Sequence, residues 1–336
     1  MKLNNVLLAA VLCGAALATA FSLPTAQGAE LPTLEISSGA SGGTYAKFLG
    51  QAADVCRDEV QTHVNLSPGG SEMNVDRLEA NEASVAAVQA DYLYLSSQTQ
   101  DLSNLKTALV LFPEQVHLVT LIESKHRVGG KMGTSFGSHP VVINSLADVG
   151  PGITVGTAGG GKVTAALIKQ SAGLQYTIVP MDTSQNVLNA LLAGQIDVAL
   201  VVGAAPMDLF RNAPPTAKAQ IKFVPVPENM ISNLKGYIPS KVGYPGINNG
   251  SSAQTIAVQS LLVTQNYGKK QPMAQAVYAF KQCLINKAED QAGVTGSHPA
   301  WRAIKADAVG KWPMWEYEPT VTVSAAPSTQ AKKIKK

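Results

Sequence analysis

The sequence predicts an α/β protein of two similar lobes, each a mainly parallel sheet flanked by helices, joined by a two-strand hinge. Short apolar strands alternate with segments of helical periodicity, which is typical of parallel sheets covered by helices. Segments 78–86 and 191–199 share the pattern Leu-x-Ala followed by Val-Ala, so the unit is repeated. Two further β-rich runs, 116–122 and 256–263, fit strands that cross between the lobes. Two crossings make a hinge, which suits ligand capture.

The composition favours an ordinary globular protein. Of 336 residues, 46% are hydrophobic and only 15% charged, which supplies core material and excludes a disordered chain. The net charge is +3, and no lysine or arginine cluster lies in the globular part, so we expect no nucleic-acid partner. The sequence has no H-E-x-x-H and no paired CxxC motif, so we expect neither metal nor cofactor.

The first 29 residues read as a signal peptide. Lys2 precedes an apolar run, residues 6–20, that is short for a membrane span. Small-x-small patterns place the cleavage site between Ala20 and Ala29, so we expect a mature periplasmic protein; an uncleaved anchor is the alternative. Residues 324–336 combine Ala, Pro, Ser and Gln with lysines, which predicts a disordered basic tail.

The expected elements follow from periodicity and turn signals. For the first lobe they are a strand at 34–36, a glycine-rich turn at 37–43, a helix through Cys56, a strand at 64–66, a helix capped by Ser71 and a strand at 85–88. For the second lobe they are a strand at 153–155, a glycine-rich turn at 156–161, a helix at 163–171, a strand at 176–179, a helix through Leu191 and a strand at 198–202. A late helix, about 273–287, returns to the first lobe. The predicted parts are lobe I at 30–118, lobe II at 119–259 and a lobe I return segment at 260–323.

The two glycine-rich turns predict a shared cleft. Ligands of open α/β sheets bind beyond the carboxyl ends of the strands, where helix N-termini offer free N–H groups to an anion. Lys162 is the only lysine or arginine in either turn, so it is our candidate counter-charge; a solvated surface lysine is the alternative. The candidate ligand-binding residues are Gly42, Gly43, Thr44, Tyr45, Ser71, Asp91, Gly160, Gly161, Lys162, Thr183 and Gly203. Alternatively, the glycines make ordinary tight turns, Tyr45 packs under its helix and Asp91 braces a loop.

Two motifs suggest other chemistry. Residues 39–43 satisfy G-x-S-x-G, which would make Ser41 a hydrolase nucleophile, but the motif follows the first strand and no local pattern supplies a base. Residues 156–162 approach a phosphate-binding loop, but Val163 stands where the Mg²⁺-binding hydroxyl belongs. We therefore expect the protein not to be an enzyme, with a secreted serine hydrolase that uses Ser41 as the remote alternative.

Cysteine usage permits one disulfide. Removal of the signal peptide leaves Cys56 and Cys283, and an even count in an oxidising compartment allows them to pair. Two buried thiols remain an equal alternative, because pairing needs strict geometry.

Several segments in a consistent order resemble one family. They are G-x-x-x-G-G-x-Y at 38–45, G-S-x-x-N at 70–74, Val-Gln-Ala-Asp at 88–91, Phe-Pro-Glu-Gln-Val-His at 112–117, and the second-lobe segments 193–197 and 203–206. Together they resemble the TAXI family of TRAP-transporter solute-binding subunits over about residues 34–308. The resemblance implies a type II periplasmic-binding fold without catalysis, working beside membrane permease subunits. The sequence departs from the family pattern at four positions. Gly160 and Lys162 stand where the family usually has Ser and Thr, and Asn81 and Ser84 stand where it usually has Gly and Asp.

The function expected from these observations is solute capture. We expect a monomeric protein that binds a small organic anion, a carboxylate, and delivers it to a TRAP-type membrane transporter. A receptor for an ABC importer or a sensor kinase is the alternative, because it would use the same fold. The sequence does not identify a particular ligand.

Overall fold

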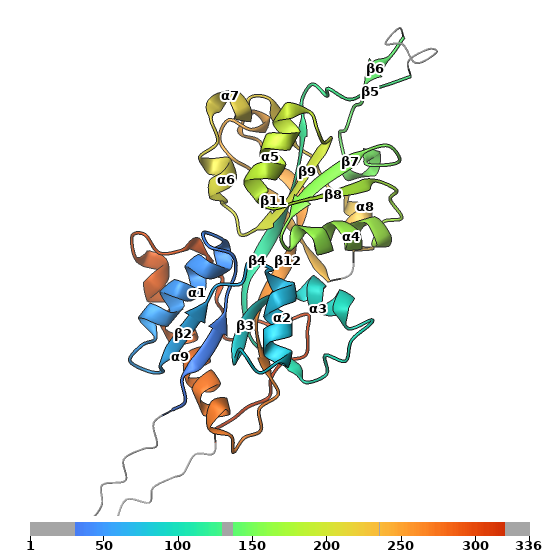
Figure 1. Ribbon diagram of the computed structural model, residues 1–336. Coiled ribbons are helices and arrows are strands. Elements are labelled where there is room, and N and C mark those ends of the chain that lie inside the picture. The colour runs from blue at the N-terminus through green and yellow to red at the C-terminus, as the bar shows by residue number, and fades with distance from the viewer. Residues whose placement is uncertain (1–30, 130–136, 235, 320–336) are drawn as a thin grey trace, which may run out of the picture. The chain divides into compact units, whose positions relative to one another are not determined.

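The computed structural model describes residues 31–129, 137–234 and 236–319 (Figure 1). The predicted signal peptide and the predicted basic tail lie outside these residues. Within the described ranges, no helix combines the length and apolar character needed to cross a membrane.

Lobe I is a doubly wound unit. Its elements are β1 (Leu34–Ser37), α1 (Thr44–Val55), β2 (Thr62–Asn65), α2 (Ser71–Glu79), β3 (Val85–Gln89) and α3 (Ala90–Ser96). Strand β1 pairs in parallel with both β2 and β3, which gives the order β2-β1-β3. The helix α9 (Pro272–Gly293) returns to this lobe and, with the 3-10 helix η4 (Pro299–Ala303), packs on the α1 face.

Lobe II repeats this arrangement. Its central elements are β7 (Thr154–Ala158), α4 (Gly161–Ser171), β8 (Thr177–Met181), α5 (Ser184–Ala193) and β9 (Val198–Gly203), with the parallel order β8-β7-β9. Smaller elements are β5 (Arg127–Val128), β6 (His139–Pro140), η2 (Leu146–Asp148), α6 (Asp208–Arg211), α7 (Pro215–Lys218), β10 (Ile221–Phe223), α8 (Glu228–Ile231), β11 (Tyr237–Val242) and η3 (Asn248–Gly250). The predicted repeat of strand, glycine turn and helix is therefore present in both lobes.

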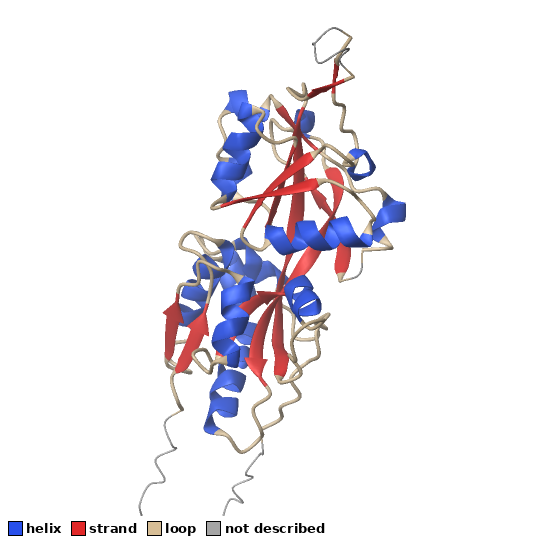
Figure 2. Cartoon of the chain, turned by 45° about the vertical axis from the view of Figure 1, so that its right-hand side comes forward, coloured by secondary structure: helices blue, strands red, loops and turns tan. Residues whose placement is uncertain are grey.

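Two long antiparallel strands, β4 (Leu105–Leu121) and β12 (Ala253–Gln265), join the lobes. Strand β12 pairs with β3 and β4 pairs with β9, so the main sheet reads β2-β1-β3-β12-β4-β9-β7-β8 (Figures 1 and 2). Two 2-1-3 units linked by two crossing strands confirm the predicted two-lobed periplasmic-binding fold. The predicted lobe boundaries, after residues 118 and 259, fall inside the crossing strands.

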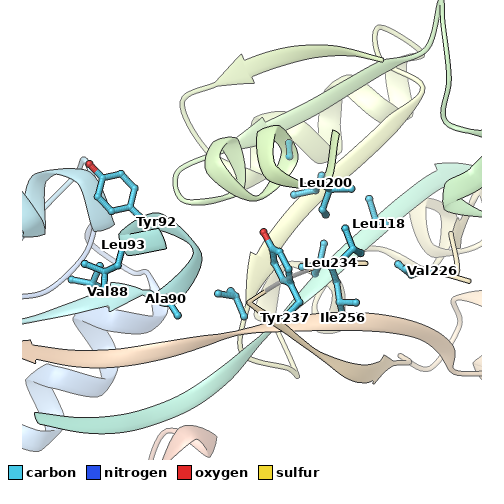
Figure 3. Close-up of a cluster of buried hydrophobic side chains, with 14 of the residues drawn as sticks. Val88, Ala90, Tyr92, Leu93, Leu118, Leu200, Val226, Leu234, Tyr237 and Ile256 are labelled. Carbon is cyan, nitrogen blue, oxygen red and sulfur yellow. The ribbon is translucent and has the colours of Figure 1, made fainter. Parts of the chain in front are cut away.

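The core follows the alternation of side chains along the strands. In β3, Val85 and Ala87 pack on the α1 and α9 side, while Ala86 and Val88 pack on the opposite side. This opposite layer continues into lobe II along the crossing strands. Figure 3 shows the continuation, with Val88, Ala90, Tyr92 and Leu93 in lobe I and Leu118, Leu200, Val226, Leu234, Tyr237 and Ile256 in lobe II. The hinge strands are thus buried in both lobes.

Two local predictions need correction. Ser71 is not an N-cap: Gly70 holds that position with φ 62°, a left-handed conformation that favours glycine, and Ser71 is the first helical residue. The second glycine turn begins later than predicted, because Gly156 pairs with Val179 in the parallel ladder of β7 and β8. The turn is only residues 159–160, and the helix starts at Gly161.

A disulfide joins Cys56 to Cys283, with a Cα–Cα separation of 5.9 Å. Cys56 ends α1 and Cys283 lies in α9, so the bond ties the first helix of lobe I to its returning segment. The link closes a sequence separation of 227 residues that passes through all of lobe II. It therefore limits the unfolded chain far more than it limits the folded one.

We expect replacement of both cysteines by alanine to lower the free energy of unfolding by about 4–5 kcal/mol, because the closed loop is long. Denaturant unfolding of oxidised wild type and the double variant measures this difference. Reduced wild type serves as the control and should resemble the variant. Equal stability of oxidised and reduced protein would contradict the prediction.

Candidate functional site

A cavity of about 700 Å³ lies between the lobes. Lobe I contributes residues 42–44 at the start of α1, Lys47 and Gln51 further along the same helix, and residues 296–299 after α9. Lobe II contributes Ser184, Ala204, residues 206–209 and Arg211. Apart from residues 296–299, these segments follow the carboxyl ends of β1, β8 and β9, the edge where open α/β sheets bind ligands.

The N-terminus of α1 opens onto this cavity. Gly43 is its N-cap, no side chain accepts a hydrogen bond there, and the first turn contains no acidic residue. The first N–H groups of a helix have no intrahelical acceptor, and they carry a partial positive charge. An anionic group in the cavity would therefore meet donors from α1 without competition from a side-chain cap.

The charges at the cavity come from both lobes. Lys47 Nζ of α1 lies 3.2 Å from Asp208 Oδ2 of α6, and Arg211 also pairs with Asp208. The hydrogen bond from Lys47, with the charges of both cations, lowers the pKa of Asp208. Two cations face one carboxylate, which leaves one positive charge for an anionic ligand. Lys47 and Asp208 are each about half exposed, with side-chain exposures of 47% and 48%, so neither is locked in place.

His298 completes the lobe I wall. Its Nδ1 accepts a hydrogen bond from the Ala300 N–H at 3.2 Å, so in the neutral ring the proton is on Nε2. Burial, and then the charge of Lys47, lower the pKa of His298. The ring is therefore a neutral donor at this wall.

The structure brings together only part of the predicted site. Gly42, Gly43 and Thr44 line the cavity. Tyr45 is 8% exposed, and its hydroxyl donates to Glu114 at 2.5 Å, so it packs beneath the helix. The predicted residues that do not line this cavity are Ser71, Asp91, Gly160, Gly161, Lys162, Thr183 and Gly203.

Several of these residues have a structural partner elsewhere in the described chain. The Ser71 hydroxyl accepts from the Gln89 N–H at 3.1 Å, and the Thr183 hydroxyl caps α5 by accepting from the Asn186 N–H at 3.1 Å. Gly160 lies against Gln89, since an added Cβ would be 2.0 Å from the Gln89 Oε1. Lys162 is exposed and forms no ion pair with any residue in the described ranges.

Asp91 braces the two lobes. It is 1% exposed and accepts hydrogen bonds from the Thr164 hydroxyl at 2.7 Å and the Tyr237 hydroxyl at 2.8 Å. Asp91 belongs to α3 in lobe I, whereas Thr164 and Tyr237 belong to α4 and β11 in lobe II. Burial raises the pKa of its carboxyl. The alternative weighed from the sequence was that Asp91 braces a loop; in the structure its carboxylate instead contacts a helix and a strand of the other lobe.

Sequence reasoning missed the buried polar residues of the hinge. Glu114 of β4 is 4% exposed, and burial raises its pKa from 4.5 to about 7. His117, on the same strand, is fully buried, and burial lowers its pKa from 6.5 to about 4. Gln89 of β3 is 4% exposed, and its Oε1 has no hydrogen-bond partner. The available signal was a carboxylate and an imidazole inside an apolar strand, where neither is expected without a reason.

No metal site emerges from the geometry. Across the described parts of the chain, no three histidine, cysteine or acidic side chains lie close enough together to hold an ion. The expectation of no metal stays a prediction.

The pKa shifts of Glu114 and His117 predict opposite pH effects on stability. The folded pKa of Glu114 is above its unfolded value, so its contribution is lost as pH rises from 4.5 through 7. The folded pKa of His117 is below its unfolded value, so its contribution to the free energy of unfolding is lost as pH falls from 6.5 through 4.

We expect Glu114→Gln to gain stability relative to wild type by up to about 3 kcal/mol between pH 4 and pH 8, because glutamine does not ionise. Denaturant unfolding at several pH values tests this, with the exposed Glu59→Gln as control; parallel curves for Glu114→Gln and wild type would contradict it.

Comparison with known proteins supplies no family. No family model matches the chain, and no curated protein matches it. Among solved structures, a histidine kinase sensor domain with similarity to periplasmic binding proteins is 14% identical, with TM-score 0.48, over 82% of this chain and 96% of that one. The Candida albicans CA3427 gene product, described as having the generic periplasmic binding protein fold, is 11% identical, with TM-score 0.46, over 82% of each chain. An ancestral arginine-binding protein bound to arginine is 12% identical, with TM-score 0.45, over 77% and 93%. These similarities are too low to carry an argument about ligand or function.

Proposed function

We propose that this protein is a periplasmic solute-binding protein that captures a small organic anion, a carboxylate, between its lobes. The observation that carries the proposal is the cavity between the lobes, which joins an uncapped helix N-terminus to two cations from different lobes. Its volume of about 700 Å³ is in the range of small-molecule sites.

Capture would work through the hinge. Lys47 is on lobe I and Arg211 on lobe II, so an anion that contacts both stabilises the closed arrangement more than an open one. Asp208 forms ion pairs with both Lys47 and Arg211, and a ligand carboxylate can share these two cations. The differential contact between open and closed arrangements supplies the free energy of closure.

The delivery step follows from the resemblance to TAXI solute-binding subunits. The segments 38–45, 70–74 and 112–117 carry that resemblance, and the predicted signal peptide would place the protein beside the membrane. We therefore propose a monomer that delivers its solute to the permease subunits of a TRAP-type transporter.

A receptor for an ABC importer or a sensor kinase is the second candidate, and it would use the same cavity. Native mass spectrometry of the purified protein would identify a co-purified solute, and transport with each candidate permease would distinguish the two roles.

Replacement of Lys47 should weaken solute binding. We expect Lys47→Met to lose about tenfold in affinity for the identified solute, because one charge-assisted hydrogen bond is lost at a half-exposed position. Lys162→Met is the matched control, since that lysine also lies in the first turn of a helix but is outside the cavity lining. Calorimetry on both variants measures the difference. Loss of affinity in Lys162→Met alone would move the anion to the second glycine turn.

Ser41→Ala should leave solute affinity unchanged. Ser41 is exposed in the turn before α1, and within the described ranges no histidine forms a hydrogen bond with it. A serine-directed phosphonate should not label the wild-type protein at this position. Stoichiometric labelling that disappears in Ser41→Ala would instead support the hydrolase.

A further inference from the structure

One wall of the proposed solute cavity is a loop without regular structure. Residues 204–207 connect β9 to α6, and Ala204, Pro206 and Met207 line the cavity. Helix α6 follows at once and carries Asp208 and Arg211, the charged residues of lobe II. The position of these two charges therefore depends on what holds the loop.

Two side chains from elsewhere in the chain hold the backbone of this loop. The Ala205 N–H donates to the Gln115 Oε1 at 2.7 Å, and the Met207 N–H donates to the Tyr244 hydroxyl at 2.8 Å. Gln115 lies on the hinge strand β4, and Tyr244 is a buried residue that follows β11. Both bonds are short and satisfy N–H groups that no other residue satisfies in the described structure.

His117 orients Tyr244. The Gln115 backbone carbonyl can only accept, so the His117 Nδ1, 3.0 Å away, carries the proton of the neutral ring. The Nε2 therefore accepts from the Tyr244 hydroxyl at 2.9 Å, and the Tyr244 oxygen in turn accepts from the Met207 N–H. The imidazole also stacks on Phe210 of α6, with ring centroids 5.1 Å apart and planes at 20°. Strand β4 thus reaches the loop and α6 through hydrogen bonds and through ring packing.

We infer that Gln115, His117 and Tyr244 are positioning residues, which fix the cavity loop and the charges of α6 to the hinge strand. The pairing of β4 with β9 supports this, because Gln115 lies opposite Gly203 and His117 opposite Val201. Movement at the hinge then carries Asp208 and Arg211 toward or away from Lys47 as one body. The importance of these charges for a solute rests on the proposed function; the coupling itself does not.

Amide hydrogen exchange of the full-length protein, measured without any solute, tests the coupling. We expect Tyr244→Phe to speed exchange at Met207 and along α6 by roughly tenfold to a hundredfold, because it removes one acceptor and leaves the His117 Nε2 unpaired. Tyr176→Phe is the matched control: Tyr176 is buried in the same lobe, and its hydroxyl donates to the Ala165 carbonyl at 2.6 Å. It should speed exchange near α4 and leave the loop unchanged.

A second pair of variants separates positioning from general loss of stability. Gln115→Leu removes the acceptor for Ala205 and should speed exchange at that amide, whereas Gln115→Glu keeps a side-chain oxygen and should restore slow exchange. Unchanged exchange at both Ala205 and Met207, or equal acceleration by Tyr176→Phe, would overturn the inference. Because no solute is present, failure of the proposed function would leave these results unaffected.

Discussion

The structure depends on two strands that must be buried in both lobes at once. Strands β4 and β12 pair with each other, and each pairs with the third strand of one lobe, so together they carry the main sheet through the hinge. Their apolar residues supply core on both faces. The lobes consequently cannot separate by unfolding a linker; they can move only by bending or twisting a shared sheet.

This constraint explains the distribution of polar groups. Glu114 and His117 are on a buried strand, and burial disfavours the charged form of each side chain. It therefore raises the pKa of Glu114 and lowers the pKa of His117. Asp91 is buried as well but accepts hydrogen bonds from lobe II, which offsets part of its desolvation. The charged side chains of the cavity, Lys47, Asp208 and Arg211, are by contrast about half exposed, so they keep much of their hydration.

Strand alternation and the glycine turns were enough to predict the two-lobed fold, the repeated unit of strand, glycine turn and helix, and the crossing strands, because hydrophobic periodicity is a local property. The order of the strands within each lobe came from the structure. The errors were also local: Ser71 is a helical residue rather than a cap, and Gly156 extends a strand. Both concern single backbone positions at element ends, where a left-handed glycine or one more ladder bond decides the boundary.

The sequence by itself determined the fold class, the presence of a glycine-rich turn before α1 and which cysteines were available for pairing. Only the tertiary structure decided that Cys56 meets Cys283, that Lys47 and Arg211 face one cavity, and that Asp91 joins the lobes. It also decided that Lys162, chosen from its turn, is outside the lining. The physical reason is that periodicity specifies which face of an element is buried, whereas a site needs residues far apart in the chain to converge. That convergence is set by how the lobes pack about the hinge, which no local pattern encodes.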